Sequence, residues 1–255
     1  MEALQRAAQA LASARNVLAI TGAGISAESG IPTFRGAGGL WEGFRAEELA
    51  TPEAFGRDPE LVWRWYRWRR DICSKAAPNP AHVALVELES RFEEFLLATQ
   101  NVDGLHPRAG SRKLIEIHGN IDTARCTKCS AILPLDDASE IPGSQVPSCP
   151  RCTGRMRPHI LWFGETYWPG VLDKAFAAAS RANAVLVIGT SAQVWPPAQI
   201  ALQAQKSGAT LIDVNPQPTE ISAAADVFLQ GKAGDLVPAL LHACDRVCGE
   251  GIRTS

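Results

Sequence analysis

The stretch that decides the fold is Val17-Leu18-Ala19-Ile20-Thr21-Gly22-Ala23-Gly24-Ile25-Ser26-Ala27. Residues 17–20 are apolar and predict a buried strand, and the residues after them form a Gly-x-Gly-x-x-Ala turn. Glycines in such a turn allow the backbone to approach a pyrophosphate, whose charge is met by N–H groups of the next helix. A tight strand-to-helix turn without any ligand is the alternative interpretation of the motif.

The residues further along distinguish this chain from an ordinary dinucleotide-binding protein. Such a protein places an acidic residue about 20 positions after the turn, at the end of a second strand, where it holds a ribose. In this chain that distance leads into residues 31–40, which lack the pattern of a strand. We therefore expect a dinucleotide that is not held as a dehydrogenase holds it.

Apolar segments rich in β-branched residues recur along the chain, and helical patterns lie between several of them. The expected strands are residues 17–20, 95–98, 114–117, 184–188, 210–214 and 227–229. The expected helices are residues 1–15, 80–92, 171–181, 197–206 and 235–244. This alternation predicts the α/β class, with a Rossmann-like, doubly wound parallel sheet that binds ligands at the carboxyl ends of its strands.

Two stretches, residues 31–79 and 122–158, interrupt the alternation of strands and helices. The first is rich in tryptophan, and the second contains paired cysteines and several prolines. We expect both to be insertions that form a smaller lobe. The larger, Rossmann-like domain is then predicted to consist of residues 1–30, 80–121 and 159–255.

The paired cysteines predict a metal site. Cys126-x-x-Cys129 and Cys149-x-x-Cys152 are separated by 19 residues, a spacing typical of a four-thiolate zinc ribbon. Four protein ligands leave no open position on the ion, so the zinc is expected to be structural. A redox dithiol would explain one pair but not two. The other cysteines are expected to be ordinary thiols: Cys73, Cys244 and Cys248.

Polar residues follow several of the expected strands. Residues 95–98 lead into Thr99-Gln100-Asn101-Val102-Asp103-Gly104-Leu105-His106, and residues 114–117 lead into His118. An Asx-type turn with a structural histidine is the alternative for the first segment. His118 is a candidate general base because the pKa of histidine lies near neutrality. Gly189-Thr190-Ser191 and Asn215-Pro216-Gln217 end two more strands and suit hydrogen bonds to ribose and phosphate.

Taken together, these motifs resemble the sirtuin family in sequence and in order. The matching segments are residues 22–26, 30–35, 99–103 and 118–119, the two cysteine pairs, and residues 189–191 and 215–217. The resemblance spans about residues 15–241. It implies NAD in a cleft between a Rossmann-like domain and a zinc-bearing lobe, and an acyl-lysine protein or peptide as the partner. NAD is consumed: nicotinamide leaves, and the acyl group is transferred to ADP-ribose.

The resemblance also implies roles for individual residues. His118 would be the general base, and Asn101 would act with Gln100 and Asp103 to orient the nicotinamide ribose and carboxamide. Phe34 and Arg35 would lie in a mobile loop over the same ring. NAD contacts are implied for Gly22, Ala23, Gly24, Ser26, Phe34, Arg35, Gln100, Asn101, Asp103, Gly189, Thr190, Ser191, Asn215, Gln217 and Ala233. The peptide would pair as an added strand between Phe163-Gly164-Glu165 and Gln193-Val194-Trp195.

Residues 63–70 indicate which acyl group the substrate is expected to carry. Tyr66 and Arg69 are three positions apart and so share one face of the predicted helix. They match the Tyr-x-x-Arg of class III sirtuins, which remove succinyl and malonyl groups, and a guanidinium with a phenol suits a carboxylate. The alternative is a basic amphipathic helix that packs its tryptophans. Arg64, Arg67 and Arg70 are expected to be solvated.

Composition and charge exclude other classes of protein. The chain has 25 basic and 27 acidic residues and a formal net charge of -2, so we expect no nucleic-acid or membrane partner. We expect a cytoplasmic monomer that removes acidic acyl groups, and acetyl more weakly. General deacetylation and mono-ADP-ribosyl transfer, which share the NAD site, stay open as alternatives. A third is a non-enzymatic zinc-ribbon module that binds nucleic acid, but the neutral charge and the lack of a basic stripe around residues 122–158 argue against it.

Overall fold

The larger part of the molecule is built on one parallel sheet. The computed structural model describes residues 2–32, 40–41, 43–137, 146–192 and 195–253. Six strands pair in the order β11-β10-β9-β1-β4-β5, and every pairing is parallel. Their bounds are β1 Asn16–Thr21, β4 Glu94–Thr99, β5 Leu114–Glu116, β9 Ala184–Ile188, β10 Thr210–Asn215 and β11 Val227–Gln230. The predicted strands and the predicted fold class are confirmed.

The order of strands places a crevice beside β1. From β1 the chain continues to β4 and β5 on one side, and then returns to β9, β10 and β11 on the other. Such a reversal is a topological switch point, where the loops that follow two neighbouring strands separate and leave room for a ligand. The loops after β1, β4 and β9 therefore form the expected binding edge.

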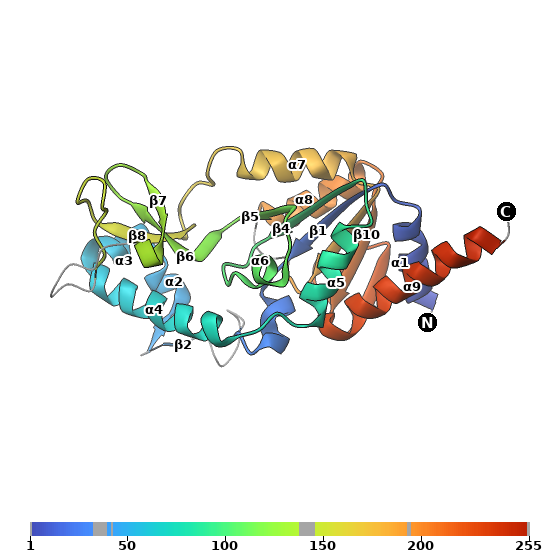
Figure 1. The fold of residues 1–255 in the computed structure, drawn as a ribbon, viewed down its shortest axis with the longest axis horizontal. Helices are drawn as coiled ribbons and strands as arrows, with labels where there is room; N and C mark the ends of the chain where they lie inside the picture. Colours follow the sequence, from blue (N-terminus) through green and yellow to red (C-terminus); the bar gives the residue numbers. More distant parts are fainter. Residues whose placement is uncertain (1, 33–39, 42, 138–145, 193–194, 254–255) are drawn as a thin grey trace.

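Helices cover both faces of this sheet (Figure 1). Alternate residues of β1 point to opposite faces. Val17 and Ala19 pack in one core with α1 (Glu2–Ala12), α5 (Pro80–Glu89) and α9 (Ala233–Arg253). Leu18 and Ile20 pack in the other core with α7 (Val171–Arg181) and α8 (Pro197–Lys206). The sheet is buried on both sides, as the apolar character of its strands requires.

Three helices differ in length from the expectation. Helix α1 ends at Ala12 rather than at residue 15. Helix α5 ends at Glu89 rather than at residue 92, because the chain turns into β4 there. Helix α9 is 21 residues long and runs well beyond the expected residues 235–244. Pro238 near its start and two glycines near its end have low helix propensity, so the sequence does not predict the full length of the helix.

The smaller lobe combines helices with a ribbon of strands (Figure 1). Its elements are β2 (Leu40–Trp41), β3 (Phe44–Arg45), α2 (Ala46–Leu49), α3 (Pro52–Arg57), α4 (Pro59–Lys75), β6 (Gly119–Cys126), β7 (Ile132–Pro134), η2 (Leu135–Asp137) and β8 (Met156–Ile160). Strands β7, β6 and β8 form an antiparallel sheet, which shares one core with α3 and α4. The division of the chain into lobes at residues 121 and 159 stays a prediction, and both positions fall inside strands of this ribbon.

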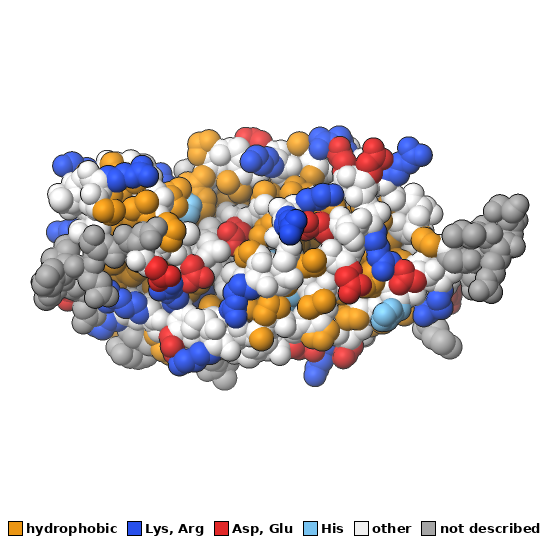
Figure 2. All heavy atoms as spheres, viewed as in Figure 1, with side chains coloured by type: hydrophobic (Ala, Val, Ile, Leu, Met, Phe, Trp, Pro, Cys, Tyr) orange, Lys and Arg blue, Asp and Glu red, His pale blue; other side chains and the backbone are white. Residues whose placement is uncertain are grey.

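The surface is mixed in charge. Figure 2 shows Lys and Arg side chains interspersed with Asp and Glu on the face that it presents. Among the described residues, no helix is long and apolar enough to cross a bilayer.

Candidate active site

The loops after β1 and β9 pack against each other through glycines. A Cβ atom on Gly24 would lie 2.7 Å from the carbonyl oxygen of Gly189, and one on Gly189 would lie 2.3 Å from the backbone nitrogen of Ile25. A Cβ on Gly22 would lie 2.7 Å from the Cβ of Thr190. These contacts are too close for any side chain. The glycines are therefore required by packing inside the protein, in addition to any approach of a pyrophosphate.

The segment after β1 is a short 3-10 helix, η1 (Ala23–Ser29), and not the α-helix expected of a dinucleotide turn. Its far end is held by α9, where the backbone N–H of Gly234 donates to the Glu28 carboxylate at 2.8 Å. This bond brings the predicted contact residue Ala233 to the edge of the same loop.

The loops after β1 and β4 meet in a buried hydrogen-bonded cluster. The Ser26 hydroxyl donates to Asp103 Oδ2 at 2.7 Å and accepts from Asn101 Nδ2 at 3.1 Å. Asn101 Nδ2 also donates to the Gly22 carbonyl oxygen at 3.1 Å, and Asp103 Oδ1 accepts from the Leu105 N–H at 2.9 Å. Burial raises the pKa of Asp103, while these hydrogen bonds and the charge of Arg69 oppose that rise. Three residues predicted from two separate motifs are thus brought together.

His118 is held in the tautomer that a general base requires. Its Nδ1 lies 3.0 Å from the carbonyl oxygen of Gln100, which can only accept, so Nδ1 carries the hydrogen. Nε2 is then the free base, and it lies 3.3 Å from the hydroxyl of Tyr167. Burial lowers the pKa of His118, so the imidazole is neutral at physiological pH. Tyr167 could not be predicted from the sequence, because no motif or periodicity surrounds it.

A second link joins the loops after β4 and β9. Gln100 Nε2 donates to the Thr190 hydroxyl at 3.1 Å, which brings another predicted pair into contact. On β10, Asn215 Nδ2 donates to the fully buried Asp213 at 2.5 Å. Gln217 is exposed beyond it. The side-chain amide of Asn215 is therefore engaged by the protein, at the strand end where the sequence predicts an NAD contact.

Two buried histidines contact each other near the end of β1. His106, in α6 (Leu105–Ala109), places Nε2 2.9 Å from the Thr21 hydroxyl, and its ring lies 4.7 Å from that of His82. Burial lowers the pKa of His106 to about 3 and that of His82 to about 4. Both rings are therefore neutral. These contacts favour the alternative interpretation of its segment, in which His106 is structural. No pattern in the sequence indicates that His82 is its partner.

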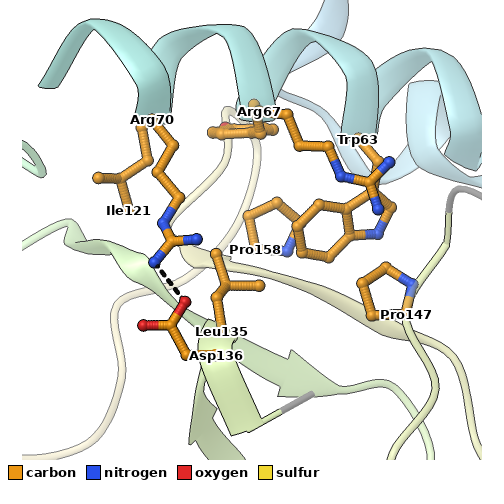
Figure 3. A pocket seen from close by; sticks show the side chains of 9 residues that line it. Trp63, Arg67, Arg70, Ile121, Leu135, Asp136, Pro147 and Pro158 are labelled. Carbon is orange, nitrogen blue, oxygen red and sulfur yellow. Dashed lines mark hydrogen bonds and ion pairs between the residues drawn. The ribbon is translucent and has the colours of Figure 1, made fainter. Parts of the chain in front are cut away.

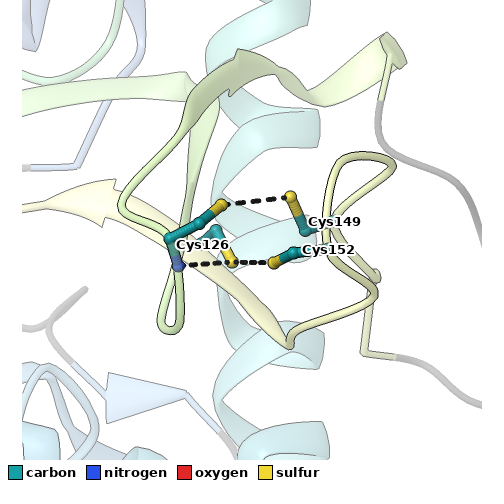
Figure 4. Close-up of side chains that lie close together, drawn as sticks. Cys126, Cys149 and Cys152 are labelled. Atoms are coloured by element: carbon teal, nitrogen blue, oxygen red, sulfur yellow. Dashed lines mark hydrogen bonds between the residues drawn. The ribbon is translucent and has the colours of Figure 1, made fainter.

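The four paired cysteines converge at the tip of the ribbon (Figure 4). Their sulfur atoms all lie within 4.8 Å of one another, and two of the separations are 3.4 Å and 3.7 Å. Four sulfurs around a tetrahedral zinc at about 2.3 Å would be roughly 3.8 Å apart. The backbone N–H groups of Lys128 and Cys129 donate to the Cys126 sulfur, as in a metal-binding knuckle. The arrangement fits one structural zinc ion bound by Cys126, Cys129, Cys149 and Cys152.

Helix α4 carries the two residues predicted to bind the acyl group. Tyr66 is buried, and its oxygen accepts a hydrogen bond from Trp162 Nε1 at 2.8 Å. The Arg69 guanidinium carbon lies 5.5 Å from the centre of the Tyr66 ring and 5.0 Å from that of Trp65. The charge of Arg69 also opposes the rise in the pKa of Asp103, so the two side chains lie near enough to interact electrostatically.

The other arginines of α4 differ from one another. Arg64 is exposed, as predicted. The expectation that Arg70 is solvated is wrong, because it pairs with Asp122 at 2.8 Å and with Asp136 at 2.9 Å. These carboxylates belong to β6 and η2, which pack beside the helix. Arg67 is half-buried and lies 5.9 Å from the Trp63 ring.

Arg67 and Arg70 border a cavity between α4 and the ribbon (Figure 3). Its volume is about 280 Å³, and its lining residues are Trp63, Tyr66, Arg67, Arg70, Ile121, Leu135, Asp136, Pro147 and Pro158. Tyr66 lines this cavity, but His118 does not.

The segment predicted to pair with a peptide follows β8. Phe163 is 53% exposed, and Gly164 has a φ of 83°, which favours glycine. The Glu165 carboxylate is turned inward, to Arg157 Nη1 at 2.5 Å and Nη2 at 2.9 Å. Any contact of Glu165 with a peptide would therefore come from its backbone. Phe34, Arg35, Gln193 and Val194 lie outside the described residues.

Comparisons with known proteins agree on one family. The model of the Sir2 family matches residues 22–196. A Pyrococcus abyssi protein named NAD-dependent protein deacylase is 51% identical over 243 residues, which are 94% of this chain and 97% of that protein. A Thermococcus kodakarensis protein of the same name is 49% identical over 97% of this chain and 98% of its own length.

Solved structures give the same answer. A Sir2 homologue in complex with NAD has a TM-score of 0.89 at 44% identity, covering 95% of this chain and 94% of that one. A mutant Sir2 homologue in complex with 2'-O-acetyl ADP ribose has a TM-score of 0.88 at 44% identity, covering 95% and 96%. A Sir2–p53 peptide–NAD+ complex has a TM-score of 0.79 at 33% identity, covering 95% and 96%.

Proposed function

The chain belongs to the Sir2 family, the sirtuins, and is an NAD-dependent protein deacylase, and we propose that it prefers acyl groups that carry a carboxylate. The proposed substrates are succinyl-, malonyl- and glutaryl-lysine, with acetyl-lysine turned over more slowly. The proposed products are nicotinamide, the free lysine and an O-acyl-ADP-ribose. The peptide is proposed to bind to a monomer of this chain as a strand beside residues 163–165.

The proposed chemistry depends on His118. NAD supplies an anomeric carbon that nicotinamide leaves and that the acyl oxygen attacks. The Nδ1–H of His118 donates to the Gln100 carbonyl oxygen at 3.0 Å, which leaves Nε2 without a hydrogen. Nε2 takes the proton of a ribose hydroxyl. That hydroxyl can then attack the acyl carbon, which allows the acyl group to migrate. Asn101 and Asp103 are proposed to orient the ribose and the carboxamide.

The acyl preference rests on the pairing of Tyr66 with Arg69. The two side chains share one face of α4, and the Arg69 guanidinium lies 5.5 Å from the Tyr66 ring centre. A guanidinium can bind both oxygens of a carboxylate, and a phenol can donate one more hydrogen bond. An acetyl group offers neither partner, so these polar groups would gain nothing from it. This pairing is the observation that carries the proposal.

Turnover of one peptide that carries either succinyl- or acetyl-lysine tests this preference. We expect the wild type to have the higher kcat/KM for succinyl. In Arg69→Met, loss of the partner of a buried carboxylate costs roughly 2–5 kcal/mol, which is a fall of roughly 30-fold or more in succinyl kcat/KM. Arg64→Met is the matched control, because Arg64 lies exposed on the same helix.

Two outcomes would overturn the proposal. A wild type that prefers acetyl-lysine, together with an Arg69→Met variant whose succinyl-to-acetyl ratio is unchanged, would make the protein a general deacetylase. That alternative has support from the relative whose complex contains 2'-O-acetyl ADP ribose. Mass added to the target protein in the presence of NAD, with no acyl group removed, would indicate mono-ADP-ribosyl transfer instead.

A further inference from the structure

A continuous chain of contacts joins the segment after β8 to the phenol of Tyr66. The Glu165 carboxylate accepts two hydrogen bonds from Arg157, at 2.5 Å and 2.9 Å. The Arg157 guanidinium carbon lies 3.3 Å from the centre of the Trp162 ring. Trp162 Nε1 in turn donates to the oxygen of Tyr66 at 2.8 Å. This series of contacts therefore ends at the Tyr66 hydroxyl, which in the proposed function binds the carboxylate of the acyl group.

The direction of the last hydrogen bond is fixed by chemistry. An indole N–H can only donate, so the Tyr66 oxygen must be the acceptor. The phenol hydrogen is then left to point elsewhere. Tyr66 is 2% exposed, and the part of the chain that the structure describes contains no hydrogen-bond acceptor for this hydrogen. A buried O–H without an acceptor is unfavourable, and a carboxylate on the acyl group is an acceptor that would satisfy it.

The position of Trp162 is itself firmly set. Its indole is 2% exposed and also packs on Phe55, with ring centres 5.4 Å apart. Arg157 is fixed by the Glu165 carboxylate and by the Ile160 carbonyl oxygen at 2.8 Å, which leaves its guanidinium flat against the indole. Glu165 also accepts from the backbone N–H of Trp162 at 2.9 Å. The indole N–H thus has little freedom to move away from Tyr66.

We propose that Trp162 determines acyl specificity by positioning Tyr66: its N–H occupies one lone pair of the phenol and directs the hydroxyl hydrogen toward the acyl carboxylate. Arg157 and Glu165 hold the indole in place. This inference rests on the proposed preference for acidic acyl groups and adds a residue to it. It also gives the inward-turned Glu165 a function that does not require contact with the peptide.

The test compares succinyl and acetyl turnover in Trp162→Phe, which removes the N–H and keeps an aromatic ring. We expect the ratio of succinyl to acetyl kcat/KM to fall about tenfold, mainly through a higher KM for the succinyl peptide. Phe55→Leu is the packing control, since it disturbs a neighbour of the indole and leaves the N–H intact. That variant is expected to change both substrates alike and to keep the ratio.

A double variant separates hydrogen bonding from packing. If Trp162 acts through Tyr66, Tyr66→Phe with Trp162→Phe should lower the ratio no further than Tyr66→Phe alone. Should Trp162→Phe fail to fold, Arg157→Lys replaces the flat guanidinium, and the ratio is again expected to fall. An unchanged ratio in the folded variants, or losses that add in the double variant, overturns the inference.

The proposed function can fail separately from this inference. A wild type that prefers succinyl-lysine and loses this preference in Arg69→Met, but keeps it in Trp162→Phe, retains the proposed function and overturns only the assignment of Trp162. A wild type that prefers acetyl-lysine overturns both.

Discussion

The proposed NAD side and the proposed acyl side of the active site are held in place by different interactions. On the NAD side, the loops after β1 and β9 are joined by a backbone hydrogen bond, from the Gly24 N–H to the Gly189 carbonyl oxygen at 2.7 Å. Ser26, Asn101 and Asp103 bond to one another beside it. On the acyl side, Tyr66 and Arg69 stand on a helix that is fixed by long side chains, among them Arg70. The first side is set by the sheet, and the second by contacts between elements distant in sequence.

This difference explains how sensitive each side should be to substitution. A close backbone contact has no room to adjust, whereas an ion pair that is partly exposed can be replaced by water at small cost.

The largest effect is expected from loss of the zinc ion. Binding energy at a structural zinc site is also folding energy, so Cys149→Ser should release zinc and unfold the ribbon that packs against α4. We expect the purified protein to lose zinc and all deacylation. The six-stranded sheet and its helices should stay folded, so much of the circular dichroism signal should remain. Cys248→Ser, at an exposed thiol, is the control. Full activity in a Cys149→Ser protein that contains no zinc would contradict the account.

Replacement of the general base should act on both acyl groups alike. His118→Ala removes Nε2, and general-base catalysis contributes roughly 10²–10⁴-fold to a rate. Single-turnover measurement of acyl release is expected to fall by that factor for succinyl and acetyl peptides, with binding of NAD largely kept. His242→Ala, at an exposed position of α9, should behave as wild type. A loss that is confined to one acyl group would mean that His118 belongs to the acyl pocket.

A methyl group added at Gly24, on the proposed NAD side, should lower both the stability of the protein and its affinity for NAD. The Cβ of Gly24→Ala would lie 2.7 Å from the Gly189 carbonyl oxygen, so the two loops must separate. We expect a loss of about 1–3 kcal/mol in the free energy of unfolding, and weaker binding of NAD. Gly56→Ala is the matched control, because nothing lies within 4 Å of a Cβ there and alanine favours the helix. Equal stability of the two variants would contradict the packing argument.

The smallest effect concerns the histidines below the NAD side. Burial lowers the pKa of His106 from 6.5 to about 3 and that of His82 to about 4. Below about pH 6.5 the unfolded chain binds protons that the folded chain does not, so the free energy of unfolding falls as the pH decreases. Each histidine contributes at most about 1.4 kcal/mol per pH unit.

An opposite contribution comes from Glu116, whose pKa burial raises from 4.5 to about 7. Between pH 7 and 4.5 the folded chain binds this proton and the unfolded chain does not, which stabilises the fold as the pH decreases. Urea unfolding between about pH 7 and 5 should therefore show a shallower fall in His106→Asn than in wild type. An identical slope, with His242→Asn as the reference, would show that His106 does not contribute.

The two sides also differ in how far the sequence could predict them. Gln100, Asn101, Asp103 and His118 follow strands whose apolar pattern is plain, and neighbouring parallel strands bring their ends together. Their positions could therefore be predicted, although their roles toward NAD stay predictions. The 3-10 form of η1 could not, because no local signal separates it from an α-helix.

The acyl side was visible only through its family motif. Tyr66 and Arg69 were found by that motif, but Trp162, Arg157 and Tyr167 were missed, since each acts through a contact between distant segments. The pairing of Arg70 with Asp122 was missed for the same reason, because the two residues belong to separate insertions. The chain has two tyrosines, and both lie near the site, yet only Tyr66 stands in a motif that indicates this.

The proposed preference requires α4 to present a carboxylate-binding pair to the acyl group. A crystal structure with a succinyl-lysine peptide shows directly whether it does. The succinyl carboxylate is expected to lie within hydrogen-bond distance of both the Tyr66 hydroxyl and the Arg69 guanidinium. A carboxylate that points into solvent, or that contacts neither side chain, would contradict it.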